Sequence, residues 1–551
     1  MRRALLALGL ALLVAAPAGW ADPSFGLGAV STLPAAFAPL RLAGVRTVKI
    51  TADWSAVEPA VGRFLWRDVD AAVAAARREG LRPVLVLAYT PVWASLATGA
   101  DARDPRVATR MPPRRVADWE RFVGEAVRRY RDVVKEWQVW TLPALPHFRG
   151  TTSEYLTLLV AARRASLAAD PASRVVAASP PGFDLIHVQR AVTQAADAAS
   201  IVSLAPIGLS PEQWLRPLAA LRQRVLAGGG RPLWVEWTAD RPEANLGALV
   251  RAAAVARAAG VERLFIIPDL RRPEEPARAV LAALEALPFT GYLVREPGVY
   301  ALVFGAGDRA ALLAWRSEGQ TALEVPVLPT ARVVTLDVRP VALSPEGKVS
   351  LTLGPVPVFV SGVGAALVEE AKAALAQRGP LLPVVPAERD FSQSSEVSVR
   401  LGRETVERGL YSVPRAGRNG VVEAVEVNGE GAVRAAPGRE AAFIYFDVDD
   451  TFLFFNDGRN DGRFDVTVAI EVLGTRAPQS VGFNLFYDAR SGYRFTPWQW
   501  VDAREGWVTH TFHLEDANFA NTAGWDFAIN AGANRPEGLT VRALTVRKVA
   551  R

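Results

Sequence analysis

The sequence has no cysteine, only two methionines and four histidines in 551 residues. Without cysteine the chain forms no disulfide bond, no thiolate metal site and no cysteine nucleophile. The histidines form no H-E-x-x-H motif, the arrangement typical of a catalytic zinc site. We therefore expect no metal and no cofactor, and we expect the stability of the protein to come from a buried core.

The sequence also lacks a strong excess of one charge. Its 63 Lys and Arg residues against 57 Asp and Glu residues give a net charge of +6, which is small for this length. No cluster of basic residues alternates with aromatic residues, so we expect no nucleic-acid partner. Half of the residues are hydrophobic and 22% are charged, as in a packed globular protein.

The only marked apolar run lies at the N-terminus, and it is too short to span a bilayer as an ordinary helix. Two arginines are followed by apolar residues from Ala4 to Ala16 and by small residues up to Ala21. This pattern predicts a secretory signal peptide over residues 1–21, with the mature chain starting near Asp22; an uncleaved anchor is the alternative. We expect an exported protein, periplasmic or extracellular, with no integral membrane segment after cleavage.

Eight short apolar runs alternate with amphipathic helical stretches in the first half of the chain. Eight such units in about 250 residues predict an α/β fold, a (β/α)8 TIM barrel over residues 22–288, with any active site at the C-terminal ends of the strands. The expected strands are Phe25–Val30, Thr47–Trp54, Arg82–Tyr89, Glu136–Thr141, Arg174–Ser179, Ser200–Pro206, Pro232–Thr238 and Arg263–Pro268.

After the barrel the sequence changes to short strands separated by turns. We expect a small all-β domain over residues 289–368, a helix and linker over residues 369–390, and a β-sandwich of the jelly-roll type over residues 391–551. Trp498 and Trp500 lie two residues apart in the sandwich, so their rings would share one face. They are candidates for a second glycan site, with a buried core pair as the alternative.

Two kinds of residue at the barrel strand ends favour a carbohydrate cleft. Four tryptophans, whose faces can stack on sugar rings, lie there, with core packing as the alternative. Glu236 lies inside an otherwise apolar seventh strand, where a carboxylate is costly unless it is paired or functional. A structural salt bridge between Glu236 and Lys49 is the alternative. The tryptophans are Trp54, Trp93, Trp140 and Trp237.

Six segments of the barrel together resemble the clan A glycoside hydrolases, retaining β-glycosidase barrels that include β-xylosidases and endoglucanases. The resemblance covers about residues 25–290, and the C-terminal part resembles β-sandwich modules appended to secreted glycan-active proteins. The segments are Gly44–Pro59, Gly62–Trp66, Tyr89–Trp93, Trp137–Trp140, Thr151–Tyr155 and Leu233–Glu236.

The resemblance implies two glutamates, a nucleophile at the end of strand seven and an acid/base after an Asn at the end of strand four. Glu236 matches the nucleophile, and Lys49, which stands where the family has an arginine on strand two, is a candidate substrate-binding residue. Where the family reads Trp-Asn-Glu-Pro, this chain reads Trp140-Thr141-Leu142-Pro143, and Leu142 cannot transfer a proton. A general acid contributes about 10²–10⁴-fold, so weak hydrolysis at most is expected.

Three hypotheses follow. The leading one is a glycoside-hydrolase-like protein that binds a polysaccharide or oligosaccharide and processes it weakly, as a possible pseudoenzyme. The first alternative is an active glycosidase with a relocated acid, for which Asp53 and Asp269 are the candidates and Asp240 is a third. The second alternative is a non-catalytic envelope scaffold whose sandwich makes protein contacts. Asp447, Asp449 and Asp450 resemble calcium ligands, but the EF-hand spacing is absent and no metal is predicted.

Overall fold

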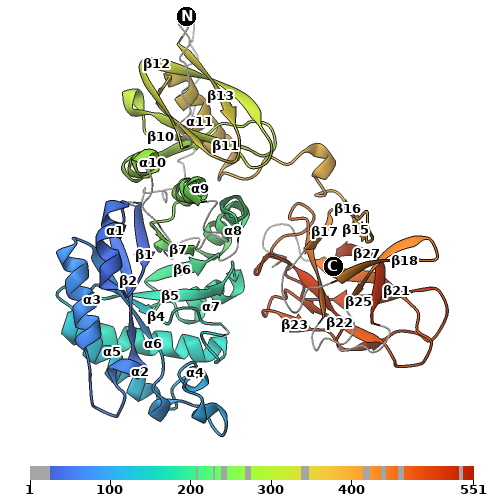
Figure 1. The fold of residues 1–551 in the computed structure, drawn as a ribbon, viewed down its shortest axis with the longest axis horizontal. Helices are drawn as coiled ribbons and strands as arrows, with labels where there is room; N and C mark the ends of the chain where they lie inside the picture. Colours follow the sequence, from blue (N-terminus) through green and yellow to red (C-terminus); the bar gives the residue numbers. More distant parts are fainter. Residues whose placement is uncertain are drawn as a thin grey trace, which may run out of the picture.

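The N-terminal half of the chain folds into a closed barrel of eight parallel strands in sequence order, which confirms the (β/α)8 prediction (Figure 1). The computed structural model describes residues 25–144, 146–206, 209–226, 230–237, 245–266, 275–336, 347–413, 422–435, 442–456, 464–532 and 538–550. The barrel strands are β1 (Gly26–Val30), β2 (Thr47–Asp53), β3 (Arg82–Ala88), β4 (Glu136–Val139), β5 (Arg174–Pro181), β6 (Ile201–Ala205), β7 (Leu233–Trp237) and β8 (Arg263–Ile266).

Helices surround this barrel. Each strand alternates between residues that face the lumen and residues that face the helices, because successive side chains of a strand point to opposite sides. The helices are α1 (Phe37–Leu42), α2 (Trp54–Val57), α3 (Arg67–Arg78), α4 (Pro105–Ala108), α5 (Val116–Tyr130), α6 (Thr152–Ala169), α7 (Leu185–Gln194), α8 (Leu215–Ala220), α9 (Asn245–Ala258) and α10 (Glu275–Ala286).

The lumen is packed rather than open. Val84, Val176, Ile201, Trp234 and Phe265 form one buried cluster inside it. Gly28 on β1 makes room for the ring of Phe265, because a Cβ atom on Gly28 would lie 2.4 Å from that ring. A functional site must therefore lie at the end of the barrel and not along its axis.

A six-stranded sheet follows the barrel, with strand order β13-β12-β14-β11-β10-β9. Tyr300, Leu302 and Phe304 on one face join the buried cluster that includes the barrel core, while Val303 on the other face packs in the cluster that contains α11. The elements are β9 (Phe289–Tyr292), β10 (Val299–Phe304), β11 (Ala311–Arg316), β12 (Thr321–Thr335), β13 (Lys348–Leu353), β14 (Val358–Val363) and α11 (Ala365–Arg378).

The C-terminal part consists of two antiparallel sheets with a common core, as a β-sandwich requires. One sheet contains β15 (Glu396–Arg400), β16 (Val406–Arg408), β18 (Val422–Val427), β19 (Glu430–Ala435), β21 (Phe464–Leu473), β25 (Trp507–Leu514) and β27 (Thr540–Ala550). The other contains β17 (Leu410–Val413), β20 (Phe443–Val448), β22 (Gly482–Tyr487), β23 (Arg494–Phe495), β24 (Gln499–Trp500) and β26 (Phe527–Asn530).

The sandwich contacts the barrel beside the C-terminal end of β5, on the side of α7 and α8 (Figure 1). The backbone N–H of Phe183 donates to the carbonyl of Thr522 at 3.0 Å, and Arg216 of α8 pairs with Asp450 at 3.2 Å. Gly182 has a φ of +88°, and a Cβ atom there would lie 1.7 Å from the carbonyl oxygen of Thr522. The sandwich therefore adjoins the rim at which the barrel strands end.

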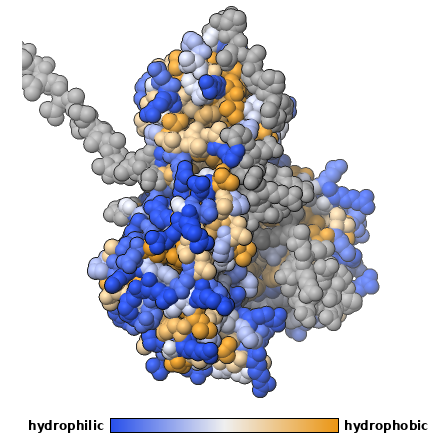
Figure 2. All heavy atoms as spheres, turned by 60° about the vertical axis from the view of Figure 1, so that its left-hand side comes forward, coloured by the Kyte–Doolittle hydropathy of each residue, from blue (hydrophilic) through white to orange (hydrophobic). Residues whose placement is uncertain are grey.

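Hydrophilic side chains cover much of the outer helical layer that Figure 2 brings forward, as expected for helices that bury only one face. No helix among the described residues is long and apolar enough to cross a membrane. The predicted signal peptide, residues 1–21, lies outside the described residues.

Candidate functional site

Glu236 faces the barrel lumen and makes a buried polar network with Lys49 and Ser203. Its Oε1 accepts from Lys49 Nζ at 2.5 Å and from Ser203 Oγ at 3.1 Å, and Lys49 Nζ also donates to Ser203 Oγ at 3.1 Å. Lys49 has no exposed surface, whereas the side chain of Glu236 keeps 10% of its surface exposed. Oε2 of Glu236 makes no hydrogen bond to a described residue. One carboxylate oxygen is therefore held, and the other has no hydrogen-bond partner in the part of the chain that the structure describes.

The surroundings of Lys49 are unusually apolar for a charged group. Its ammonium lies 4.1 Å from the ring centroid of Phe265 and 5.2 Å from that of Trp234. Burial lowers the pKa of Lys49, and the adjacent Glu236 carboxylate opposes this effect. The predicted salt bridge between Lys49 and Glu236 is present. Lys49 is fully enclosed and offers no surface to a sugar, so its contacts favour a role in positioning Glu236 over the predicted role in substrate binding.

The strand-four side of the rim carries a different set of groups. Leu142, which the sequence resemblance aligns with an acid, lies half-buried three residues beyond the end of β4. The hydroxyls of Tyr89 and Thr141 lie 3.1 Å apart, and the guanidinium of Arg110 lies 3.4 Å above the ring of Tyr89. None of these side chains is a carboxylic acid. Among the described residues, this part of the rim therefore offers hydroxyl groups, one cation and the half-buried His147, and none of the groups named here is a carboxylic acid.

Two of the four tryptophans pack the core and not a cleft. Trp54 and Trp140 have no exposed surface. Trp54 stacks on Phe122 of α5 at 5.3 Å, and Trp140 meets Phe148 at 4.9 Å and donates its indole N–H to the carbonyl of His147. Their rings cannot stack on a sugar in this structure, which corrects the prediction for both.

The other two tryptophans are also anchored by hydrogen bonds. Trp237 is 5% exposed and donates to the carbonyl of Leu209 at 3.2 Å. Trp93 is half-buried and donates to the carbonyl of Glu58 at 2.9 Å. Trp93 therefore presents the most accessible ring of the four, and its role in binding stays a prediction.

The candidate relocated acids differ in what the structure says of them. Asp53 ends β2 and caps α2, because its Oδ1 accepts from the backbone N–H and the hydroxyl of Ser55 at 2.9 and 2.6 Å. It also borders a groove of about 510 Å³ that Thr51 and Trp66 help to line. Asp240 and Asp269 lie outside the described residues.

Trp498 and Trp500 form an exposed pair on the surface of the sandwich. Trp498 and Trp500 are 39% and 48% exposed, and their ring centroids are 6.1 Å apart with an angle of 72° between the planes. Trp498 lies across two glycines, since a Cβ atom on Gly482 or Gly532 would come within 3 Å of its indole ring. The alternative of a buried core pair is therefore wrong, whereas glycan binding there stays a prediction.

Buried carboxylates gather near the contact between sandwich and barrel. Burial raises the pKa of Asp447 to about 8, that of Asp488 to about 7 and that of Asp450 to about 6. Asp526 accepts backbone N–H bonds from Val448 and Asn521, which gives it a structural role. Among the described residues, no three His, Cys, Asp or Glu side chains are arranged to hold a metal ion.

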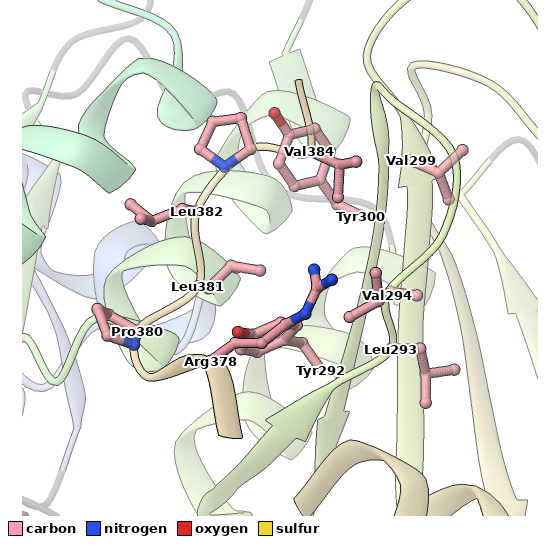
Figure 3. A pocket seen from close by; sticks show the side chains of 12 residues that line it. Tyr292, Leu293, Val294, Val299, Tyr300, Arg378, Pro380, Leu381, Leu382 and Val384 are labelled. Atoms are coloured by element: carbon pink, nitrogen blue, oxygen red, sulfur yellow. The ribbon is translucent and has the colours of Figure 1, made fainter. Parts of the chain in front are cut away.

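A separate pocket of about 320 Å³ lies between the sheet that follows the barrel and the segment after α11. Tyr292, Tyr300 and Leu381 line it, and Figure 3 shows the guanidinium of Arg378 reaching between Leu381 and Val294. The hydroxyl of Tyr292 donates to the carbonyl of Gly379, so this pocket lies where the linker packs on the sheet. Nothing in it matches the residues implied by the family resemblance.

Two residues of the rim and lumen were not found from the sequence. Ser203 could have been found, because it is a polar residue within the apolar strand Ile201–Ala205. Arg110 could not, because it lies in a long loop with no periodic pattern, 21 positions after the tyrosine that it contacts.

Similar solved structures are glycoside hydrolases. A family 39 glycoside hydrolase from the gut symbiont Bacteroides cellulosilyticus has a TM-score of 0.50 at 16% identity, over 62% of this chain and 81% of that one. The likeness shows the fold. A family 30 endoxylanase from Clostridium papyrosolvens (12% identity, 62% of this chain and 96% of that one) has a TM-score of 0.43. A glucosidase from Croceicoccus marinus (14% identity, 96% of both chains) has a TM-score of 0.39.

No protein-family model matches the chain, and no curated protein matches it. The barrel resembles clan A glycoside hydrolases in its architecture, with β domains after it. Because a fold hosts many activities, the reaction has to be argued from the site.

Proposed function

We propose that this protein binds a polysaccharide or oligosaccharide at the C-terminal end of the barrel and hydrolyses unactivated glycosides weakly at most. The observation that carries this proposal is that the two sides of the rim carry different functional groups. Glu236 is held by Lys49 and Ser203 with its second oxygen free, as a nucleophile would need. The residue in the place of the acid is Leu142, and no carboxylate adjoins it among the groups described on that side.

In this proposal Glu236 attacks the anomeric carbon of the sugar with Oε2. Lys49 and Ser203 hold Oε1, so they fix the carboxylate plane and stabilise its negative charge. Departure of the leaving oxygen would have to occur without protonation, which is fast only for strongly activated leaving groups. A natural glycan would therefore bind and turn over slowly.

Binding and turnover can be separated experimentally. We expect the full chain to bind at least one glycan from a broad array while its hydrolysis of that glycan stays near background. Activated aryl glycosides of the same sugar should be cleaved faster than the natural glycan by several powers of ten. Equal and rapid cleavage of both would contradict the proposal.

An active glycosidase with Asp53 as relocated acid is the second candidate, because Asp53 borders a groove at the end of β2. Its test is Asp53→Asn. Loss of hydrolysis of a natural glycan in this variant, with binding unchanged, would favour the relocated acid. An unchanged trace activity is the outcome we expect.

We further propose that Trp498 and Trp500 form a second glycan site. Each exposed ring can cover one sugar face, with a contribution of about 0.5–1.5 kcal/mol. Replacing both with alanine should lower retention on an insoluble polysaccharide several-fold. Val406→Ala is the matched control, because Val406 is also exposed but lies on β16 in the opposite sheet. Equal retention of wild type and double variant would contradict the site.

Export is proposed from the N-terminal sequence pattern alone. N-terminal sequencing of protein recovered from outside the cytoplasm should begin near Asp22. An intact N-terminus on membrane-bound protein would instead support the uncleaved anchor.

A further inference from the structure

Arg110 is an arginine at the barrel rim that has no counter-ion in the part of the chain that the structure describes. Among the described residues, no carboxylate lies within ion-pair distance of its guanidinium, and its side chain makes no hydrogen bond. Its Nη1 is fully buried. A guanidinium is always charged and carries five N–H donors, so leaving them without acceptors in a half-buried position is costly.

Two other partly buried arginines of the barrel have acidic partners. Arg121, on α5, reaches the carboxylate of Glu58 at 2.5 Å, and Arg251, on α9, reaches that of Glu212 at 2.9 Å. Both are partly buried and both have an acidic partner. Arg110 is also partly buried, but no described carboxylate pairs with it, which distinguishes it from these two structural ion pairs.

The structure around Arg110 holds its guanidinium in place. The Cζ atom of the guanidinium lies 3.4 Å from the centroid of the Tyr89 ring. Tyr89 is fixed in turn, because its hydroxyl contacts that of Thr141. The backbone on either side is tied down as well, since the hydroxyl of Thr90 donates to the carbonyl of Met111 at 2.6 Å and the N–H of Arg149 donates to the carbonyl of Arg110. A stacked guanidinium of this kind is preorganised for a planar anion.

The position of this cation identifies where its ligand would lie. Tyr89 follows β3 and Thr141 follows β4, so both lie at the C-terminal ends of the strands. The positive charge of Arg110 also reaches His147, whose pKa is lowered first by burial and second by that charge. The strand-three and strand-four side of the rim therefore carries a positive charge at Arg110, and a neutral glycan would not require such a charge.

We propose that the barrel rim takes an acidic glycan, with Arg110 binding a carboxylate or sulfate group on the sugar. This inference rests on the proposed function and adds the class of glycan. Arginine binds both groups through paired N–H donors, which makes such contacts stronger than those to a neutral hydroxyl. The chemistry is shared by uronic acids and sulfated sugars, and the experiment distinguishes them.

The test is calorimetric titration of the full chain with pairs of oligosaccharides that differ only in charge. One pair is an oligouronate and its carboxyl-reduced form, and the other is a sulfated galactan oligosaccharide and its desulfated form. We expect wild type to prefer the charged member of one pair by about tenfold or more at low salt. Which pair shows the preference tells carboxylate from sulfate.

Arg110→Gln should abolish this preference, and Arg110→Lys should retain only part of it, because lysine keeps the charge but not the paired donors. Arg103→Gln is the control, since Arg103 is exposed in the same loop and the variant loses the same charge. The preference is a ratio measured within each variant, so a partial loss of folded protein does not change it.

Three results would overturn the inference. The neutral members could bind as tightly as the charged ones in wild type, which would leave the proposed function standing without its acidic substrate. Arg110→Gln could keep the full preference, or Arg103→Gln could lose it, and either would remove Arg110 from the site. Absence of binding to every oligosaccharide, charged and neutral, would refute the proposed function itself.

Discussion

The two sides of the barrel rim treat charge in opposite ways. On the β2 and β7 side, a carboxylate and an ammonium neutralise each other within 2.5 Å, and Ser203 completes the network. On the β3 and β4 side, the cation Arg110 has no described acidic partner, and Leu142, where the sequence resemblance implies an acid, follows β4. The comparison shows a charge-neutralised buried pair on one side of the rim and a cation without a described acidic partner on the other, and the proposed function assigns attack on the sugar to the first side and binding of an anion to the second.

The largest effect should come from supplying the missing acid. Leu142→Glu places a carboxylic acid at the position implied by the family, and a general acid contributes about 10²–10⁴-fold. We expect a gain of this order in the hydrolysis rate of glycosides with poor leaving groups. Leu142→Gln has nearly the same shape but transfers no proton and is the control. Equal rates for the two variants would show that the two sides of the rim do not cooperate in the expected geometry.

The next largest effect concerns the buried ion pair between Lys49 and Glu236. Breaking the buried pair with Lys49→Met or with Glu236→Gln leaves one group uncompensated and should lower the free energy of unfolding by about 3–5 kcal/mol. The double variant Lys49→Met/Glu236→Gln should recover most of this loss, because no charge then remains buried. Denaturant unfolding of the wild type and the three variants measures these changes in the free energy of unfolding. Additive losses in the double variant would show that the two groups are not coupled.

A smaller effect is expected where the sandwich adjoins this rim. Gly182→Ala introduces a Cβ atom into the carbonyl of Thr522 in addition to left-handed backbone strain. Gly44→Ala is the matched control, because its φ is also positive (+92°) but nothing lies within 4 Å of the added atom. Gly182→Ala should expose the residues 519–525 to limited proteolysis, whereas Gly44→Ala should cost about 1 kcal/mol of stability only. Similar proteolysis of both variants would show that the contact is not maintained in solution.

A separate effect, which does not depend on any substitution, is a dependence of stability on pH. The folded pKa values of Asp447, Asp488 and Asp450, raised to about 8, 7 and 6 by burial, lie above the value of about 3.9 in an unfolded chain. Between these values the unfolded state binds fewer protons than the folded state, so stability falls as the pH rises from about 4 to 8. The melting temperature should decrease over this range, and less so in Asp447→Asn. A melting temperature that rises with pH would contradict these assignments.

The fold could be predicted from the sequence because each barrel strand is a short apolar run bounded by helical stretches. The tryptophans show where the prediction failed and how it could have been improved. Side chains alternate along a strand, so a lumen-facing Lys49 places Trp54 on the helical face, and a lumen-facing Glu236 places Trp237 there. Applying this alternation to the sequence would have predicted that Trp54 and Trp237 pack against the helices.

Trp140 could not have been predicted in this way. The alternation along β4 would turn its ring to the same side as Gln138, but its φ of +63° departs from the strand conformation, and the ring packs instead against Trp119 and Phe148. Arg110 was missed for a related reason, because its position depends on how a long loop folds back over β3 and not on any local pattern.

Covalent trapping with 2-fluoro glycosides tests the central claim most directly, because their activated leaving groups depart without protonation. The full chain would be incubated with a panel of such glycosides, neutral and acidic, and analysed by intact-protein and peptide mass spectrometry. We predict a stable adduct on Glu236 that is absent from a folded Glu236→Gln variant. If sugars from the panel bind to the folded protein but none forms an adduct on Glu236, the attacking side of the site is not functional and the account is wrong.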